Sequence, residues 1–201
     1  MTIEQSYRDE CDTIRLLIDE FEHTGAEHII DNIDVINKVE ALDMLEYKKP
    51  EAIPHILTFL TSSLLVHCIS LLEYRLPILV VFCIRSTGGL IPVESEKVSN
   101  QNVLLWMKKI LKDYEGFTFD FGDELCERVN AWTKLRNDLI HNGGYRSERV
   151  KQRHIDILQG VKVGDIHSLY DVQFVACRNA INDVEAFFLK VHKTLSASSE
   201  K

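Results

Sequence analysis

The chain has few residues that interrupt helices, with only four prolines and nine glycines among its 201 residues. Proline breaks a helix interior and glycine weakens it, so this scarcity leaves room for long helices. The chain also lacks a glycine-rich phosphate loop, an HExxH motif and any cysteine/histidine spacing suited to zinc. We therefore expect neither a P-loop nucleotide site nor a metal centre, and we predict no cofactor.

Signals of secretion are missing as well. The chain opens with no basic and apolar leader followed by a cleavage site, and it contains no CxxC pair. Its cysteines form an odd, scattered set that is typical of free, mostly buried thiols in a reducing cytoplasm. They are Cys11, Cys68, Cys83, Cys126 and Cys177. We therefore predict a cytoplasmic location.

Hydrophobic and charged contents of 45% and 27% are typical of a globular chain, and the length suits one domain. The net charge of −8 is uneven, because residues 1–52 hold fourteen acidic and five basic side chains. Apolar residues recur every three or four positions in residues 4–22 and again in 26–47. This pattern predicts an acidic helical hairpin over residues 1–50 that turns at Thr24-Gly25. Its charges are most simply a solvated face, and a basic partner is the alternative.

Residues 55–85 are the most apolar part of the chain, and residues 56–72 contain no Asp, Glu, Lys or Arg. That length approaches a membrane span, but hydroxyl and imidazole side chains, Glu73, Arg75 and Pro77 all interrupt it. We predict a buried central helix that Pro77 kinks or breaks, and no membrane association.

A polar stripe runs along this helix at steps of four, three and three, formed by Ser63, His67, Ser70 and Glu73. Buried polar groups need partners. We expect Ser63 to bond back to its own helix. For Ser70 and Glu73 two readings are open: local partners, or a cleft shared with the helix described next.

The clearest helix is predicted to run up to His141. Apolar residues recur every three or four positions through it, at Leu125, Val129, Trp132, Leu135 and Leu139. Asp123 is the expected N-cap and Gly143-Gly144 the expected stop. Arg136 and His141 therefore lie in the last turns of a helix whose other face belongs to the core.

Arg136 and His141 together fit chemistry on a phosphodiester. An always-charged guanidinium suits a phosphate, and an imidazole that titrates near neutrality suits proton transfer. The two lie about 140° apart around a regular helix, and the length of arginine allows them to converge. Asn137 and Asp138 are spaced to orient the imidazole of His141. The alternative is an ordinary helix end, with Arg136 in a surface ion pair and His141 favoured by the helix dipole.

The run Arg136-Asn137-Asp138-Leu139-Ile140-His141 resembles the Arg-x(4–6)-His motif of the HEPN superfamily, in which a polar residue often follows the arginine. Members are α-helical domains, and many are dimeric, metal-independent ribonucleases of RNA processing, toxin–antitoxin and antiviral systems. The resemblance covers residues 55–195 as a helical layout, not as residue identities. The subgroup paired with nucleotidyltransferase antitoxins carries His-x-Tyr, and this chain departs from it because Gly143 stands in place of the tyrosine.

A basic segment follows the motif, with four basic residues and one acid over residues 145–154. A phosphate backbone beside the site would suit its basic side chains, Arg146, Arg149, Lys151 and Arg153. A solvated loop is the equally open alternative.

The remaining segments complete a single domain over residues 1–201, with a core bundle over 51–195. We expect a loop over 86–100, a helix over 101–114, a β-hairpin over 155–163 that turns at Gln159-Gly160, and a last helix over 171–195. The 3–4 spacing of that last helix predicts a core seam, with a subunit contact as the alternative. Residues 196–201 are expected to fray.

By resemblance, the chain is expected to be an all-α, HEPN-like bundle and a metal-independent endoribonuclease in a prokaryotic defence or toxin–antitoxin setting. Its partners would be RNA, a second copy in a homodimer, and an antitoxin or defence complex. Arg136 and His141 would be catalytic and leave 2′,3′-cyclic phosphate ends, supported by Asn137, Asp138, Ser70 and Glu73. Two alternatives stay open: a non-catalytic HEPN-like nucleotide- or RNA-binding or dimerisation module, and an unrelated helical adaptor whose acidic hairpin binds a basic partner.

Overall fold

The structure is a computed structural model that describes residues 2–36, 49–86, 102–112, 119–164 and 169–198. Its described elements are α1 (Ile3–Ile36), α2 (Lys49–Ser86), α3 (Val103–Lys112), α4 (Glu124–His141), α5 (Gln152–Asp156), β1 (Val161–Val163), β2 (Tyr170–Val172) and α6 (Phe174–Ser198). The two strands pair antiparallel, with Val161 opposite Val172. The prediction of a mostly helical chain with one small hairpin is therefore confirmed.

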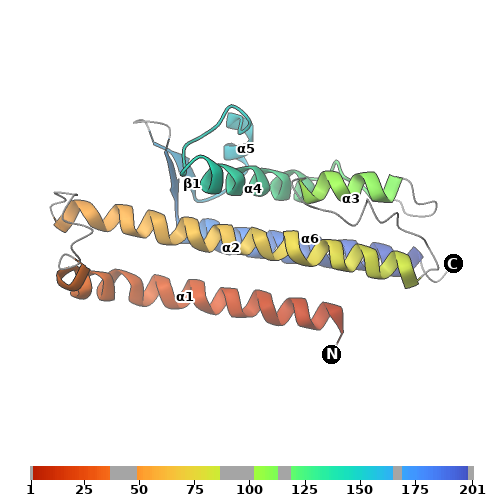
Figure 1. Cartoon of the computed structure of the whole chain (residues 1–201), viewed down its shortest axis with the longest axis horizontal. Coiled ribbons are helices and arrows are strands. Elements are labelled where there is room, and N and C mark those ends of the chain that lie inside the picture. The colour runs from red at the N-terminus through yellow and green to blue at the C-terminus, as the bar shows by residue number, and fades with distance from the viewer. Residues whose placement is uncertain (1, 37–48, 87–101, 113–118, 165–168, 199–201) are drawn as a thin grey trace.

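The long helices form a bundle with α2 and α6 side by side at its centre (Figure 1). α1 packs along one side of this pair, and α4 and α3 lie along the other. The residues of the apolar seam of α6 are each at most 1% exposed: Cys177, Ile181, Val184, Phe188, Val191 and Leu195. This confirms the prediction of a core seam, because neighbouring helices of the same chain cover it.

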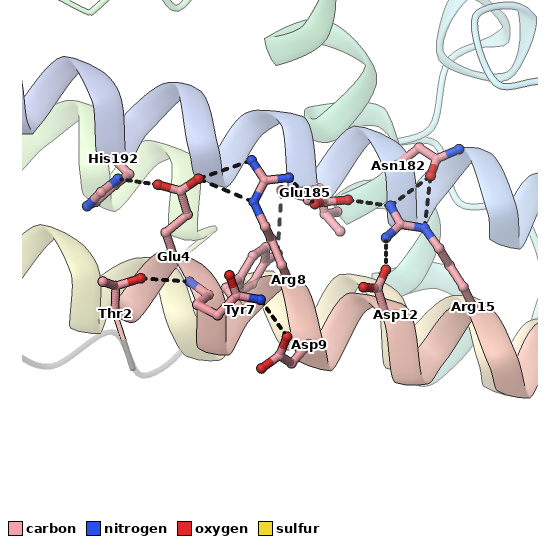
Figure 2. A network of polar contacts seen from close by, with 12 residues as sticks. Thr2, Glu4, Tyr7, Arg8, Asp9, Asp12, Arg15, Asn182, Glu185 and His192 are labelled. Atoms are coloured by element: carbon pink, nitrogen blue, oxygen red, sulfur yellow. Dashed lines mark hydrogen bonds and ion pairs between the residues drawn. The ribbon is translucent and has the colours of Figure 1, made fainter.

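Ion pairs join α1 to its neighbours. Figure 2 shows Arg8 and Arg15 of α1 both reaching Glu185 of α6. On the other side, Glu10 of α1 pairs with Arg75 of α2. Acids of α1 that pair with arginines of other helices are Glu10, with Arg75, and Asp19 and Glu22, both with Arg178 of α6. These pairs leave less acidic charge for a basic partner than the sequence suggests.

α1 runs without a break through Thr24-Gly25, so the predicted helical hairpin over residues 1–50 is wrong. A glycine inside a helix is only about 1 kcal/mol less favourable than alanine. The turn before it is held by two contacts: Thr24 Oγ1 donates to Glu20 O at 2.5 Å, and Arg178 of α6 pairs with Glu22. Residues 37–47 of the second predicted helix lie outside the described residues.

Pro77 was predicted to kink or break its helix, and it does not break it, because α2 continues to Ser86. A proline in a helix interior costs about 3 kcal/mol. The fully buried Leu76, Leu79 and Val80 around it offset this, since burying one such side chain contributes about 1.5–3 kcal/mol. By length and composition alone, Thr58–Ser86 suffices to cross a membrane, a test that core helices of soluble proteins also pass. Here α2 packs against α1, α4 and α6.

The predicted hairpin over 155–163 is displaced along the chain. Its first two residues, Ile155 and Asp156, end the helix α5, and β1 pairs with a strand that begins at Tyr170. Ile155 and Leu158, three residues apart, are buried while Ile157 is 37% exposed, so the inward-facing period is helical. Gly160 follows with φ +83°, and a Cβ placed there would lie 2.4 Å from Val175 Cγ1 of α6.

Other boundaries shift by a few residues. The last helix begins at Phe174 because β2 occupies the residues before it, and it includes residues 196–198 of the predicted frayed tail. The helix predicted over 101–114 is described over Val103–Lys112. The loop predicted over 86–100 lies outside the described residues except for Ser86, which ends α2.

Candidate functional site

The helix that carries the motif begins and ends as predicted. Asp123 caps α4, and its Oδ1 accepts from Cys126 N at 2.8 Å. After the helix, Gly143 and Gly144 have φ values of +59° and +84°, which side chains of L residues rarely allow. The inward face of α4 is buried at Val129, Trp132 and Leu135. The sequence therefore placed the helix and its core face correctly.

A buried carboxylate fixes the chain beyond α4. Asp138 is 3% exposed, and its Oδ2 accepts from Tyr170 Oη at 2.8 Å and Ser147 N at 2.9 Å. Its Oδ1 accepts from Asn142 Nδ2 at 2.9 Å. Burial, together with this bond to Asp138, raises the pKa of the Tyr170 hydroxyl. Both oxygens of Asp138 are thus engaged by other donors, and the expected contact with the imidazole of His141 is not formed.

Arg136 lies on the side of α4 that faces α2. Its Nη2 is 3.3 Å from Glu73 Oε2 and 3.5 Å from Ser70 Oγ, both on α2. Its Nη1 donates to Asn137 Oδ1 at 3.0 Å. The Nε–H is buried and has no acceptor among the described residues. Two readings were left open for Ser70 and Glu73: local partners, or a cleft shared with the motif helix. Their contacts with Arg136 place both side chains beside that helix.

The polar stripe on α2 divides into two parts. Ser63 Oγ donates to Phe59 O at 2.9 Å, as predicted for a hydroxyl that bonds back to its own helix, and His67 is exposed. Further along, burial raises the pKa of Glu73, although the positive charge of Arg136 acts in the opposite direction. Arg136 and Glu73 are each 22% exposed, so they form a half-buried pair that solvent reaches from one side.

His141 stands apart from this pair. Its side chain is exposed at the end of α4, and within the described part of the chain it makes no side-chain hydrogen bond or ion pair. The side-chain oxygen of Asn137 accepts from Arg136 instead of holding the imidazole. A single copy of the chain therefore presents Arg136 and His141 on one helix end without joining them.

A groove of about 500 Å³ lies one helical turn from Arg136. α2 contributes Phe59, Ser63 and Val66 to its walls, and α4 with its following glycines contributes Leu139, Ile140 and Gly143. Leu139 and Ile140 follow Arg136 by three and four residues, so they continue its side of the helix. The groove is mostly apolar and open to solvent, which suits an apolar side chain or a base more than a bare ion.

The basic segment lies elsewhere. In Figure 1, α5 is on the side of α4 that faces away from α2. Arg146 is engaged locally, because its Nε donates to Val150 O at 2.8 Å and its Nη1 to Gln152 Oε1 at 2.9 Å. Arg149 is exposed, and Arg153 lines a hollow together with Lys134 of α4. Lys151 is exposed as well. Of these four basic side chains, Arg153 is thus the one that the structure places beside α4, next to Lys134 and not next to Arg136.

Sequence reasoning missed two side chains of that hollow, Lys134 and His154. His154 is 7% exposed, and its Nε2 lies 3.0 Å from Lys134 Nζ. The only available signal was a histidine within the basic segment, because the 20 residues between the two conceal the contact.

Comparison with known proteins does not extend this picture. No protein-family model, no curated protein and no solved structure matches the chain.

Proposed function

We propose that the chain is a metal-independent endoribonuclease of the HEPN type that acts as a homodimer, with Arg136 and His141 in its site. The observation that supports this is the setting of Arg136. Its guanidinium is held between Ser70 and Glu73 at a half-buried position, and its buried Nε–H has no acceptor in the described chain. A phosphate oxygen would supply such an acceptor, and the planar fork of arginine binds phosphate through two donors.

The reaction follows from these groups. The 2′-hydroxyl oxygen attacks the adjacent phosphorus while the bond to the 5′-oxygen breaks, which leaves a 2′,3′-cyclic phosphate and a 5′-hydroxyl. His141 of one protomer removes the proton of the 2′-hydroxyl, and His141 of the partner subunit donates a proton to the leaving oxygen. Arg136 stabilises the charge that develops on the phosphate. Glu73 is its counter-ion in the free protein and competes with the phosphate for the guanidinium.

A second copy is proposed to cover the outward face of α2, which we define as Phe59, Tyr74, Ile78 and Phe82. These side chains are 76%, 66%, 43% and 57% exposed. Single exposed apolar residues are ordinary, but a row of them along one face of one helix is typical of an interface. Ser70 lies on this row between Phe59 and Tyr74, so a partner seated there would bring its own α4 toward Arg136.

Cleavage assays test the chemistry. The full chain is incubated with total RNA in the presence of EDTA, and we expect cyclic phosphate ends. His141→Ala should lower the rate by about 10²–10⁴-fold, the range typical of a lost acid–base group. Arg136→Ala should lower it by about 10²–10³-fold, the range typical of a lost donor to a developing anion. Arg136→Lys should also fail, because an ammonium lacks the planar fork. His192→Ala, on α6, is the matched control and should cleave at the wild-type rate.

Three results would reject the assignment: a requirement for magnesium, wild-type cleavage by His141→Ala, or a matching loss in the His192→Ala control. Melting temperatures recorded alongside separate lost chemistry from lost folding.

Sedimentation tests the second copy. Ile78→Glu, on the outward face of α2, should dissociate the dimer at micromolar concentration and reduce cleavage. Leu105→Glu, at a residue of α3 that is 65% exposed, is the matched control and should leave both unchanged. A wild-type monomer with full activity would remove the claim that two copies build the site.

A second candidate function is a non-catalytic RNA-binding or dimerisation module of the same fold. The exposed His141, with no side-chain partner in the described part of the chain to set its tautomer, favours it. RNA binding without cleavage, weakened by Arg136→Ala but not by His141→Ala, would select this candidate.

A further inference from the structure

A second cluster of basic side chains lies on the other side of α4. Lys134 is two residues from Arg136, about 200° around the helix, so its side chain leaves α4 away from α2. It meets His154 of α5, with 3.0 Å between Lys134 Nζ and His154 Nε2. None of the residues of the proposed cleavage site takes part in this cluster.

The hydrogen bonds of His154 place two donors opposite each other. Its Nδ1 accepts from Lys151 N at 3.0 Å, so Nδ1 carries no proton and Nε2 carries one. The Nε2–H then points at Lys134, whose ammonium form has only donors. The pair is satisfied only if Lys134 is a free amine, or if an acceptor enters between them.

The charges around Lys134 and His154 also disfavour the protonated form of both side chains. Burial, then Arg153 and Lys151, lower the pKa of Lys134. Burial and the same cations, with Lys134 itself and Arg146, lower the pKa of His154. Four basic side chains therefore crowd one position, and an anion there would relieve their repulsion.

A hollow of about 220 Å³ opens at this position. Its walls include Lys134, Arg153 and His154, together with Asn130, Glu127 and Ile157. Glu127 brings the one acidic side chain of the wall and is exposed at its edge. Within the described ranges no ion pair joins Glu127 to Lys134 or Arg153. Asp156 of α5 is the other nearby acid, and its carboxylate accepts from Gln152. Most of the polar side chains in its wall therefore carry hydrogen-bond donors, and the hollow is large enough for one tetrahedral anion.

We propose that this hollow binds a terminal phosphate group, held by Lys134, Arg153 and the Nε2–H of His154. A phosphomonoester is a dianion near neutral pH, so it neutralises more of the cluster than a backbone phosphodiester does. Its oxygens accept from Lys134 and His154 at once, which removes the donor–donor contact. The ligand class is thus a phosphomonoester, whether a small molecule or the phosphorylated end of a nucleic-acid strand.

Calorimetry of the full chain with inorganic phosphate at low ionic strength tests the proposal. We expect binding that weakens at least tenfold in Lys134→Met and in Arg153→Gln. Arg149→Gln removes a cation of the same segment that does not line the hollow, and it should bind as the wild type does. Lys134→Met should melt no lower than the wild type without phosphate, because it removes a cation from a crowded cluster, and phosphate should no longer raise its melting temperature.

Two RNA strands that differ only in a 5′-phosphate or a 5′-hydroxyl identify the source of the group. Tighter binding of the phosphorylated strand assigns the hollow to strand ends, and equal binding with retained affinity for inorganic phosphate assigns it to a small ligand. Absence of phosphate binding, or equal binding by Lys134→Met, Arg149→Gln and the wild type, would overturn the proposal. His141→Ala removes the proposed acid–base group and no phosphate ligand, so it should bind phosphate as the wild type does, and loss of cleavage in that variant bears on the proposed nuclease alone.

Discussion

Removing the carboxylate of Asp138 should strongly destabilise the protein. The substitution Asp138→Ala removes the acceptor of three donors. Water can reach the exposed Asn142, but Tyr170 Oη and Ser147 N, which now lie 2.8 Å and 2.9 Å from Oδ2, are left without acceptors. A buried donor that loses its partner costs about 1–3 kcal/mol. Two of them give about 4 kcal/mol, a large share of the roughly 5–15 kcal/mol of a typical domain.

Asp138→Asn should be much milder. One amide oxygen can still accept from Tyr170 and Ser147, and the amide of Asn142 can turn to face the new Nδ2. Only the extra strength of bonds to a charged acceptor is lost, about 1–2 kcal/mol. Asp156→Ala, at an exposed carboxylate that accepts one bond from a neighbouring side chain, is the matched control and should change stability by less than about 0.5 kcal/mol.

Urea denaturation followed by circular dichroism measures all three variants. We expect the order Asp138→Ala, Asp138→Asn, Asp156→Ala, from the most to the least destabilised. A cost for Asp138→Ala below about 1 kcal/mol would refute the role of this carboxylate as an anchor. If Asp138 instead oriented His141, as the spacing in the sequence suggested, Asp138→Asn would abolish RNA cleavage while leaving stability almost unchanged.

Further variants test the packing and the charges. Gly160→Ala should destabilise by more than about 1 kcal/mol in the same denaturation assay, because φ is +83° and the added Cβ would meet Val175 at 2.4 Å; an unchanged midpoint would contradict this packing. Arg178 lowers the pKa of Glu22, so this pair stabilises fully above the unfolded pKa of about 4.3 and its contribution is lost as pH falls through the lower folded value. Glu22→Gln should therefore be less stable than the wild type at pH 7, by at most about 1 kcal/mol, and equal to it at pH 2–3 in thermal melts; a gap that persists in acid would point to packing. The five cysteines are buried and free. Burial raises the pKa of each thiol, to about 12 for Cys11 and about 11 for Cys126. A thiol-reactive dye at pH 8 should therefore label them only after unfolding, and rapid labelling of the folded chain would argue against this burial.

Local signals in the sequence were enough for the helix that carries the motif. Asp123 offers a side-chain oxygen to the first turn, and Gly143 and Gly144 accept φ values that other residues resist. The apolar spacing of α6 likewise predicted its buried seam. These features depend on residues that are neighbours along the chain, so periodicity and capping chemistry suffice to predict them.

Signals that weaken a helix locally were misleading where packing opposes them. Thr24-Gly25 predicted a turn and Pro77 a kink or a break, yet α1 and α2 continue through them. The compensation depends on packing against the rest of the bundle: Arg178 of α6 pairs with Glu22 in the turn before Gly25, and the residues of α2 beside Pro77 are buried. The free energies of these contacts cannot be estimated from one segment of the sequence at a time.

The candidate sites show the same division. The sequence by itself determined that Arg136 and His141 end one helix, because that follows from the helical repeat. The tertiary structure alone decided that Ser70 and Glu73 contact Arg136, that Asp138 serves as an anchor, and that Lys134 meets His154. Each of these contacts joins residues on different elements, and the physical reason they escape the sequence is that side-chain direction depends on how packed helices face one another.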